Sequence, residues 1–202
     1  MYRNRIKRLL DILLSACGIL CLSWLLLLLA VAIKLDSPGP VLFRQKRVGI
    51  GKRHFQILKF RTMRMDTPHD MPTHLLHDPE QYITRMGRFL RKTSLDELPQ
   101  LWNILVGDMA VIGPRPALWN QYDLLAQRDK YGANDVRPGL TGWAQIHGRD
   151  ELEIAEKAKL DGWYVEHISF LLDVKCFFGT ITAVLRHDGV VEGGTGTLHD
   201  EK

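Results

Sequence analysis

Cysteine is scarce in this chain of 202 residues, and no histidine cluster at metal-ligand spacing accompanies it. Cys17 and Cys21 are four residues apart in an apolar run, Cys176 stands alone, and no C-x-x-C sequence occurs. A disulfide framework or a structural zinc site is therefore not expected. No internal repeat is visible, and the length predicts one compact domain with an appendage.

Acidic residues are nearly absent from the first third of the chain. Residues 1–8 hold four basic side chains and no acid, and residues 34–64 hold nine against the single acid Asp36. With a net charge of +4 and a pI near 9.0, the chain suits anionic partners such as phosphates, a membrane surface or nucleic acid. No nucleic-acid motif is recognised, so we expect no nucleic-acid partner.

Residues 12–33 form a run of 22 residues without a charge. A helix needs roughly 20 residues to cross the hydrocarbon core of a bilayer, so membrane contact is expected. No convincing small-residue cleavage site follows the run, and it is longer than the apolar part of a signal peptide. We therefore expect a retained anchor.

Basic residues on both sides of this run bear on its topology, because Lys and Arg prefer the cytoplasmic side. A re-entrant helix that enters and leaves by one face satisfies both flanks. Such a hairpin needs a break near its middle, for which Gly18 and Ser23 are the candidates because the first proline is Pro38. A straight span with its basic N-terminus outside is the alternative.

The remaining pattern predicts a mixed α/β fold, mainly helical with a small β-hairpin, in which amphipathic helices lie on the membrane or the core. The expected division is a membrane anchor over residues 1–36, a cytoplasmic catalytic domain over 37–190 and a flexible tail over 191–202. Strands are predicted at 41–45, 54–60 and 110–112, a loop at 66–80, and helices at 81–91, 95–105, 116–130, 151–166 and 168–185.

The paired carboxylates of Asp96 and Glu97 are the strongest candidates for chemistry. Ser94-Leu95-Asp96-Glu97 is also a capping-box pattern, and that purely structural interpretation would be the more common one for these four residues alone. The same geometry places both acids in a first helical turn, where bound phosphate is favoured. One acid can attack phosphorus while the other holds Mg²⁺ that bridges substrate phosphates.

Several motifs in fixed order resemble those of the bacterial sugar transferases, the monotopic polyprenyl-phosphate phosphoglycosyl transferases. The similarity spans nearly the whole chain, and its length resembles that of the minimal members with one domain. The matching segments are Lys7-Arg8-Leu9-Leu10-Asp11, Pro38-Gly39-Pro40-Val41-Leu42-Phe43-Arg44-Gln45, Lys59-Phe60-Arg61-Thr62-Met63, Ser94-Leu95-Asp96-Glu97-Leu98-Pro99-Gln100, Gly113-Pro114-Arg115-Pro116 and Arg137-Pro138-Gly139-Leu140-Thr141-Gly142-Trp143.

This resemblance implies transfer of a sugar-1-phosphate from a UDP-sugar to polyprenyl (undecaprenyl) phosphate, with release of UMP. By the family pattern, Asp96 is the nucleophile that forms a covalent phosphosugar enzyme, and Glu97 is the principal ligand of Mg²⁺. Arg91 and Arg115 match arginines that contact phosphate or nucleotide, and guanidinium groups suit bidentate phosphate binding.

Other matching residues carry less weight. Lys59 and Arg61 are two apart on a predicted strand and can face one anion, although a solvated basic face is equally compatible. Arg149 is a candidate for holding the uridine diphosphate. Asp161, Tyr164 and Asp173 fit the later family pattern, although helix caps and packing explain such residues at least as often.

One departure concerns the anchor, where the family usually has Ser-Pro in the middle of the helix and this chain has Ser23-Trp24. A serine that bonds back to a helix carbonyl still favours a bend.

The expected location is the bacterial inner membrane, with the catalytic domain facing the cytoplasm.

Alternatives are a membrane-bound protein that binds anionic lipid, an inactive homologue, a lipid-phosphate phosphatase or an ordinary glycosyl transferase. The identity of the sugar, the glycan that is built (capsule, O-antigen, exopolysaccharide or glycoprotein glycan) and a homodimer are left open by the sequence.

Overall fold

A computed structural model describes residues 2–67, 79–148 and 152–186 of the chain. After a short π-helical turn, η1 (Tyr2–Ile6), it begins with the long helix α1 (Lys7–Asp36). The apolar run contains no proline, so its backbone can satisfy its own hydrogen bonds until Ser37 turns to an extended conformation before Pro38. Within the described residues, α1 is the helix long and apolar enough to cross a membrane.

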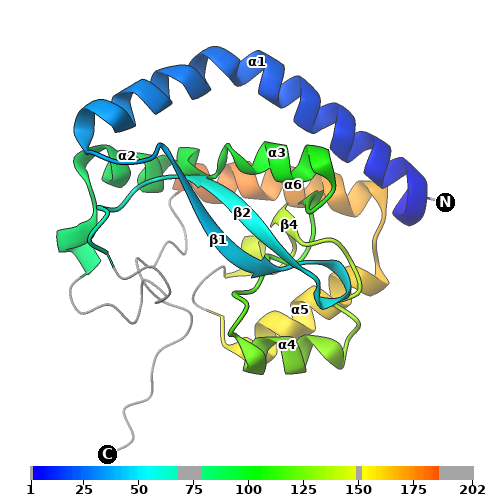
Figure 1. The fold of residues 1–202 in the computed structure, drawn as a ribbon. Helices are drawn as coiled ribbons and strands as arrows, with labels where there is room; N and C mark the ends of the chain where they lie inside the picture. Colours follow the sequence, from blue (N-terminus) through cyan, green and yellow to red (C-terminus); the bar gives the residue numbers. More distant parts are fainter. Residues whose placement is uncertain (1, 68–78, 149–151, 187–202) are drawn as a thin grey trace, which may run out of the picture.

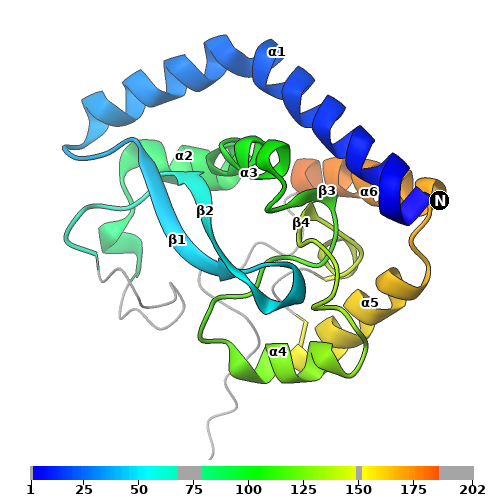
Figure 2. The ribbon, with the colours of Figure 1, turned by 45° about the vertical axis from the view of Figure 1, so that its right-hand side comes forward.

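Helix α1 is one continuous helix that bends near its middle and arches over the rest of the molecule (Figures 1 and 2). The expected break near the middle is thus a bend within one continuous helix. Ser23 Oγ donates a hydrogen bond to the Leu20 carbonyl at 2.9 Å, and such back-bonding favours helix bending. Gly18 allows close packing on α3 (Gln100–Val106), since a Cβ atom there would lie 3.2 Å from Leu101.

Both ends of α1 are fixed to the same globular body. At its start, the Arg8 guanidinium donates to the Ile104 and Leu105 carbonyls, and the Asp11 carboxylate accepts from the Val111 amide. At its end, Leu29 and Ile33 are buried. The side chains between these contacts are largely exposed: Leu13, Leu14, Leu20, Trp24, Leu27, Leu28 and Val31.

The predicted hairpin is confirmed. Strand β1 (Leu42–Val48) pairs antiparallel with β2 (His54–Phe60), and the turn between them contains η2 (Ile50–Lys52). Gly51 and Lys52 both have positive φ angles near 60° there, which reverses the chain tightly. Strand β1 runs three residues past the predicted end at Gln45, because its partner supplies hydrogen bonds as far as Val48.

Two predicted helices have other bounds. After the 3₁₀ turn η4 (Pro79–Tyr82), α2 (Arg85–Thr93) begins four residues later than expected, because Thr84 caps it by accepting from the Gly87 amide. The helix expected over residues 95–105 is divided into η5 (Leu95–Glu97) and α3 (Gln100–Val106). The prediction missed that Pro99, which has no amide hydrogen, lies between the two parts.

The second sheet has two parallel strands, β3 (Ala110–Ile112) and β4 (Gly139–Thr141). Strand β3 was predicted and β4 was missed, because three residues are too few to show an alternating pattern. The three later helices each begin after the expected residue: α4 (Tyr122–Asp129), α5 (Ile154–Glu166) and α6 (Phe170–Arg186). The 3₁₀ turn η6 (Gln145–His147) precedes α5.

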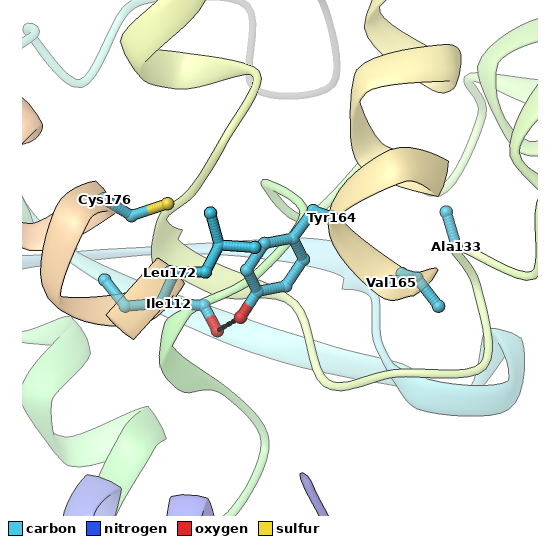
Figure 3. Packing of buried hydrophobic residues seen from close by; sticks show 6 residues of the cluster. All are labelled: Ile112, Ala133, Tyr164, Val165, Leu172 and Cys176. Carbon is cyan, nitrogen blue, oxygen red and sulfur yellow. Dashed lines mark hydrogen bonds between the residues drawn. The ribbon is translucent and has the colours of Figure 1, made fainter. Parts of the chain in front are cut away.

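One hydrophobic core joins β3 to α5 and α6. Figure 3 shows Tyr164 among Ile112, Val165, Leu172 and Cys176, with its hydroxyl oxygen 3.3 Å from the Ile112 carbonyl oxygen, a longer contact than the one to Asp173 with which it shares the hydroxyl proton. Most of the predicted loop and the whole predicted tail lie outside the described residues. Helices α2, α3 and α6 lie below α1 in both ribbon views, while α4 and α5 lie on the far side of the body.

Candidate active site

Asp96 and Glu97 lie on η5, at the junction between α2 and α3. Ser94 has a left-handed backbone (φ 56°, ψ 16°), and its amide donates to the Arg91 and Leu90 carbonyls, so it ends α2. Its side chain makes no capping hydrogen bond, and the capping-box interpretation is therefore wrong. An N-cap residue needs an extended backbone, whereas this serine occupies the conformation of a helix C-cap.

Glu97 is held by two cationic side chains. Lys59 Nζ, on β2, donates to Glu97 Oε1 at 2.8 Å, and Arg115 donates to both carboxylate oxygens, with Nη1 at 3.3 Å from Oε2. Burial opposes ionisation here, but the charges of Arg115 and Lys59 outweigh it and hold the pKa of Glu97 well below its ordinary value. Glu97 is thus ionised, and the hydrogen bonds from Lys59 and Arg115 fix the orientation of its carboxylate.

Asp96 has a different environment from its neighbour. It is 9% exposed, and Lys59 Nζ lies 3.8 Å from its Oδ2. Burial raises the pKa of Asp96, and the charge of Glu97 adds to this rise against the attraction of Lys59, Arg91 and Arg115. The pKa values of the two carboxylates are thus shifted in opposite directions, so Asp96 is the more basic of the pair and Glu97 the more firmly ionised.

Arg115 is positioned by a frame that no sequence motif indicated. It follows β3 between Pro114 and Pro116, and its carbonyl accepts from Arg128 Nη1 at 2.9 Å. Arg128 is itself buried and pairs with Asp161 through Nε and Nη2, at 2.8 and 2.5 Å. The sequence indicated only that Arg128 lies in a predicted helix, and gave no sign of its role.

A second, partly buried arginine supports the same segment. Arg47 Nη1 donates to the Pro116 carbonyl at 3.1 Å, and burial, together with the charge of Arg115, lowers the pKa of Arg47 to about 10. The sequence shows Arg47 as one basic residue among several in the hairpin. Its role depends on a contact with Pro116, which is far away in the sequence, so the sequence alone gives no sign of that role.

The structure brings Lys59 to the dyad but gives Arg61 other partners. Strand β2 ends at Phe60, so the alternation that placed Lys59 and Arg61 on one face stops there. Arg61 is buried and donates to the Ser37 and Pro38 carbonyls at 2.7 and 2.6 Å, which ties down the turn after α1. Arg91 donates from Nε to Thr62 Oγ1 at 3.0 Å, and its charge acts on Asp96.

The other predicted residues lie in supporting positions. Tyr164 donates to Asp173 Oδ1 at 2.7 Å, and Asp173 also accepts from Tyr2 at 2.5 Å and pairs with Lys7. These contacts join α5 and α6 to the start of the chain. Asp161 acts through Arg128, and Arg149 lies outside the described residues.

Residues 2–187 match the family model described as bacterial sugar transferase. An uncharacterized sugar transferase of Bacillus subtilis is 40% identical over 92% of this chain and 90% of its own length. A UDP-glucose:undecaprenyl-phosphate glucose-1-phosphate transferase of Caulobacter vibrioides is 44% identical, over 90% of this chain and 70% of the relative.

A third relative differs in its sugar and its length. It is a UDP-N-acetylgalactosamine-undecaprenyl-phosphate N-acetylgalactosaminephosphotransferase of Aeromonas hydrophila, which is 42% identical over 89% of this chain. The matched region makes up 44% of that relative, so the chain spans less than half of it. The names of these relatives indicate two different sugar donors.

Proposed function

Because this chain belongs to the bacterial sugar transferase family, we propose that it transfers a sugar-1-phosphate from a UDP-sugar to undecaprenyl phosphate and releases UMP. The named activities of the similar proteins from Caulobacter and Aeromonas support this reaction class. The product, a polyprenyl-diphospho-sugar, is the form in which the first sugar of a bacterial surface glycan enters the membrane.

The observation that carries the proposal is the placement of two adjacent carboxylates, Asp96 and Glu97, against the cationic side chains of Lys59 and Arg115. The carboxylate of Asp96 is buried and basic, and attacks the sugar-bearing phosphorus; the bond from that phosphorus to the UMP oxygen breaks and UMP leaves. An oxygen of the lipid phosphate then attacks the same phosphorus and frees Asp96. A carboxylate nucleophile thus divides one difficult displacement into two easier ones.

Cationic side chains around the dyad offset the charge that develops on the transferring phosphate. Lys59 and Arg115 are already within hydrogen-bond distance of Glu97, and the charge of Arg91 acts on Asp96. Their positions are set before the substrate arrives, so no reorganisation is needed at the reacting centre. Arg149 stays a proposal for binding the nucleotide phosphates, whereas the Arg61 guanidinium already donates to the Ser37 and Pro38 carbonyls.

Mg²⁺ fits this donor set as a substrate-bound ion. No group of three or more His, Cys, Asp or Glu side chains that could hold a metal alone occurs in the described part of the chain. Mg²⁺ is commonly held by one or two carboxylates together with substrate phosphates, which Glu97 beside Asp96 allows. When bound, the ion would neutralise phosphate charge, and Glu97 would hold it while Lys59 and Arg115 keep that carboxylate ionised.

The membrane arrangement is proposed from the way α1 packs. Both of its ends contact one globular body, while its middle is exposed and apolar. If α1 spanned the membrane as a straight helix, its two ends would lie on opposite sides of the bilayer, and the body that contacts both ends would have to lie inside the bilayer. A re-entrant helix on the cytoplasmic face of the inner membrane avoids this. Exposed apolar residues on α2, α3 and α6 suit the interfacial plane: Phe89, Trp102, Val106, Phe170, Leu171, Phe177 and Phe178.

Single-cysteine labelling tests this topology. In a variant without Cys17, Cys21 and Cys176, we expect Arg5→Cys and Pro40→Cys in intact cells to resist a membrane-impermeant maleimide from the periplasm. Both residues are exposed and should be labelled after the cells are opened. Lys130→Cys, on the body, is the cytoplasmic control. Labelling of Arg5→Cys alone in intact cells would establish a straight span instead.

Nucleotide release tests the reaction. Purified full-length protein in lipid nanodiscs, given Mg²⁺, undecaprenyl phosphate and a panel of UDP-sugars, should release UMP with one donor and stop when EDTA is added. The panel should include UDP-glucose and UDP-N-acetylgalactosamine. Release of UDP would indicate an ordinary glycosyl transferase, and release of inorganic phosphate would indicate a phosphatase.

A further inference from the structure

Gln145 carries a buried amide that has no hydrogen-bond partner. The residue is 9% exposed, and within the described structure neither its Oε1 nor its Nε2 is paired. Buried polar atoms without partners lower stability, and a leucine of similar size would avoid that cost. An unpaired amide at this position is accounted for if it binds a group from outside the chain.

The neighbours of Gln145 show which way its side chain faces. Trp143 stacks on Trp163 of α5 with ring centroids 4.6 Å apart, and Ile146 packs on Gly179 of α6. Gln145 Oε1 instead lies 3.2 Å from the position that a Cβ atom on Gly142 would take. The same position is 2.2 Å from the Gly113 carbonyl oxygen, so the amide lies near the ends of both β3 and β4.

This placement puts Gln145 beside the segment that carries Arg115. Strands β3 and β4 are parallel, and the segments that leave their carboxyl ends are Gly113-Pro114-Arg115 and Gly142-Trp143-Ala144-Gln145. Ligands of α/β proteins commonly bind at the carboxyl ends of parallel strands. Arg115 reaches Glu97 from one of these segments, and Gln145 is available from the other.

The chemistry of an unpaired amide limits its partner. Nε2 donates and Oε1 accepts, so the matching ligand presents an acceptor and a donor side by side. A phosphate accepts only and would leave Oε1 unpaired. Uracil presents both, since its N3–H donor is flanked by two carbonyl oxygens, and protein amides bind base edges in this bidentate manner.

We propose that Gln145 binds the uracil of the sugar donor through the N3–H group and an adjacent carbonyl oxygen. The proposal rests on the proposed function, because it takes the donor to be a uridine nucleotide. The three single bonds of the glutamine side chain allow the amide to turn from its buried position toward the base. Gln145 is then the residue that selects the nucleotide, while Arg115 and Lys59 serve the phosphates.

The test compares Gln145→Leu with the unaltered full-length protein in nanodiscs, by calorimetry with UMP and with 3-methyl-UMP. The methyl group removes the N3–H donor and leaves the phosphate and ribose unchanged. The unaltered protein should bind UMP at least tenfold more tightly than 3-methyl-UMP, and the variant should bind both equally weakly. Its melting temperature should rise, because an unpaired amide has been removed. Gln56→Leu, at an exposed position of β2, should change none of these values.

Each other outcome overturns the proposal. Equal UMP affinity of the variant and the unaltered protein would exclude a uracil contact, and so would equal affinity of the unaltered protein for the two nucleotides. Weaker UDP-sugar binding by the variant with unchanged UMP affinity would place the amide at the sugar. A lowered melting temperature would give Gln145 a structural role. UMP release by the unaltered enzyme in any of these cases would leave the proposed function standing.

Discussion

Replacing Asp96 with asparagine is expected to abolish UMP release, with turnover falling at least ~10³-fold as expected for loss of a nucleophile. An amide cannot attack phosphorus, so the phosphosugar adduct should disappear as well. Incubation with a UDP-sugar in the absence of the lipid, followed by peptide mass spectrometry, should show the added mass on Asp96 of the unaltered enzyme only.

The same variant should be at least as stable as the unaltered protein. Burial raises the pKa of Asp96, which means that the folded state disfavours its ionised form. Its contribution to stability is therefore present below the ordinary aspartate pKa and lost as pH rises through the folded-state value. At neutral pH asparagine removes this cost, and thermal unfolding should show the gain shrinking in acid.

Asp123→Asn makes the same chemical change at an exposed position of α4 and should leave turnover intact. Turnover of Asp96→Asn above a tenth of the original rate, measured early enough to limit deamidation, would rule out Asp96 as the nucleophile. A lowered melting temperature would show that the loss of activity comes from the fold.

Replacing Arg128 with methionine is expected to cost about 3–5 kcal/mol of folding free energy, the usual result of removing one partner of a buried ion pair. Arg128 and Asp161 are 4% and 1% exposed, so the remaining carboxylate has no access to water. The Arg115 carbonyl also loses a donor, so Arg115 should be held less firmly against Glu97. Urea unfolding and the rate of UMP release measure the two effects.

A double variant separates the charge effect from the packing effect. Arg128→Met with Asp161→Leu leaves no unpaired charge and should recover much of the lost stability while activity stays low. Burial already raises the pKa of Asp161, so the deficit of the single variant should shrink as pH falls and the carboxyl takes up a proton. A single variant as stable as the unaltered protein would show that this pair does not hold the site.

Local sequence signals were reliable wherever neighbouring residues decide the structure. The apolar run formed one helix, and alternating residues on each side of a glycine turn formed the hairpin of β1 and β2. Ser94-Leu95-Asp96-Glu97 was ambiguous, because a capping box and a catalytic dyad use the same residues. The backbone of Ser94 excludes the capping box, and its left-handed conformation depends on how α2 ends rather than on these four residues alone, while the catalytic dyad stays a prediction.

The sequence by itself determined the long apolar helix, the hairpin and the family of this protein, because each depends on residue types in fixed order along the chain. Only the tertiary structure decided which cations meet Glu97, that Arg61 binds the turn after α1, and that Arg128 and Arg47 donate to the backbone carbonyls of the Arg115 segment. These contacts join residues far apart in sequence. The opposite pKa shifts of Asp96 and Glu97 arise from burial and from charges on other elements, so adjacent carboxylates acquire different chemistry only when the chain folds.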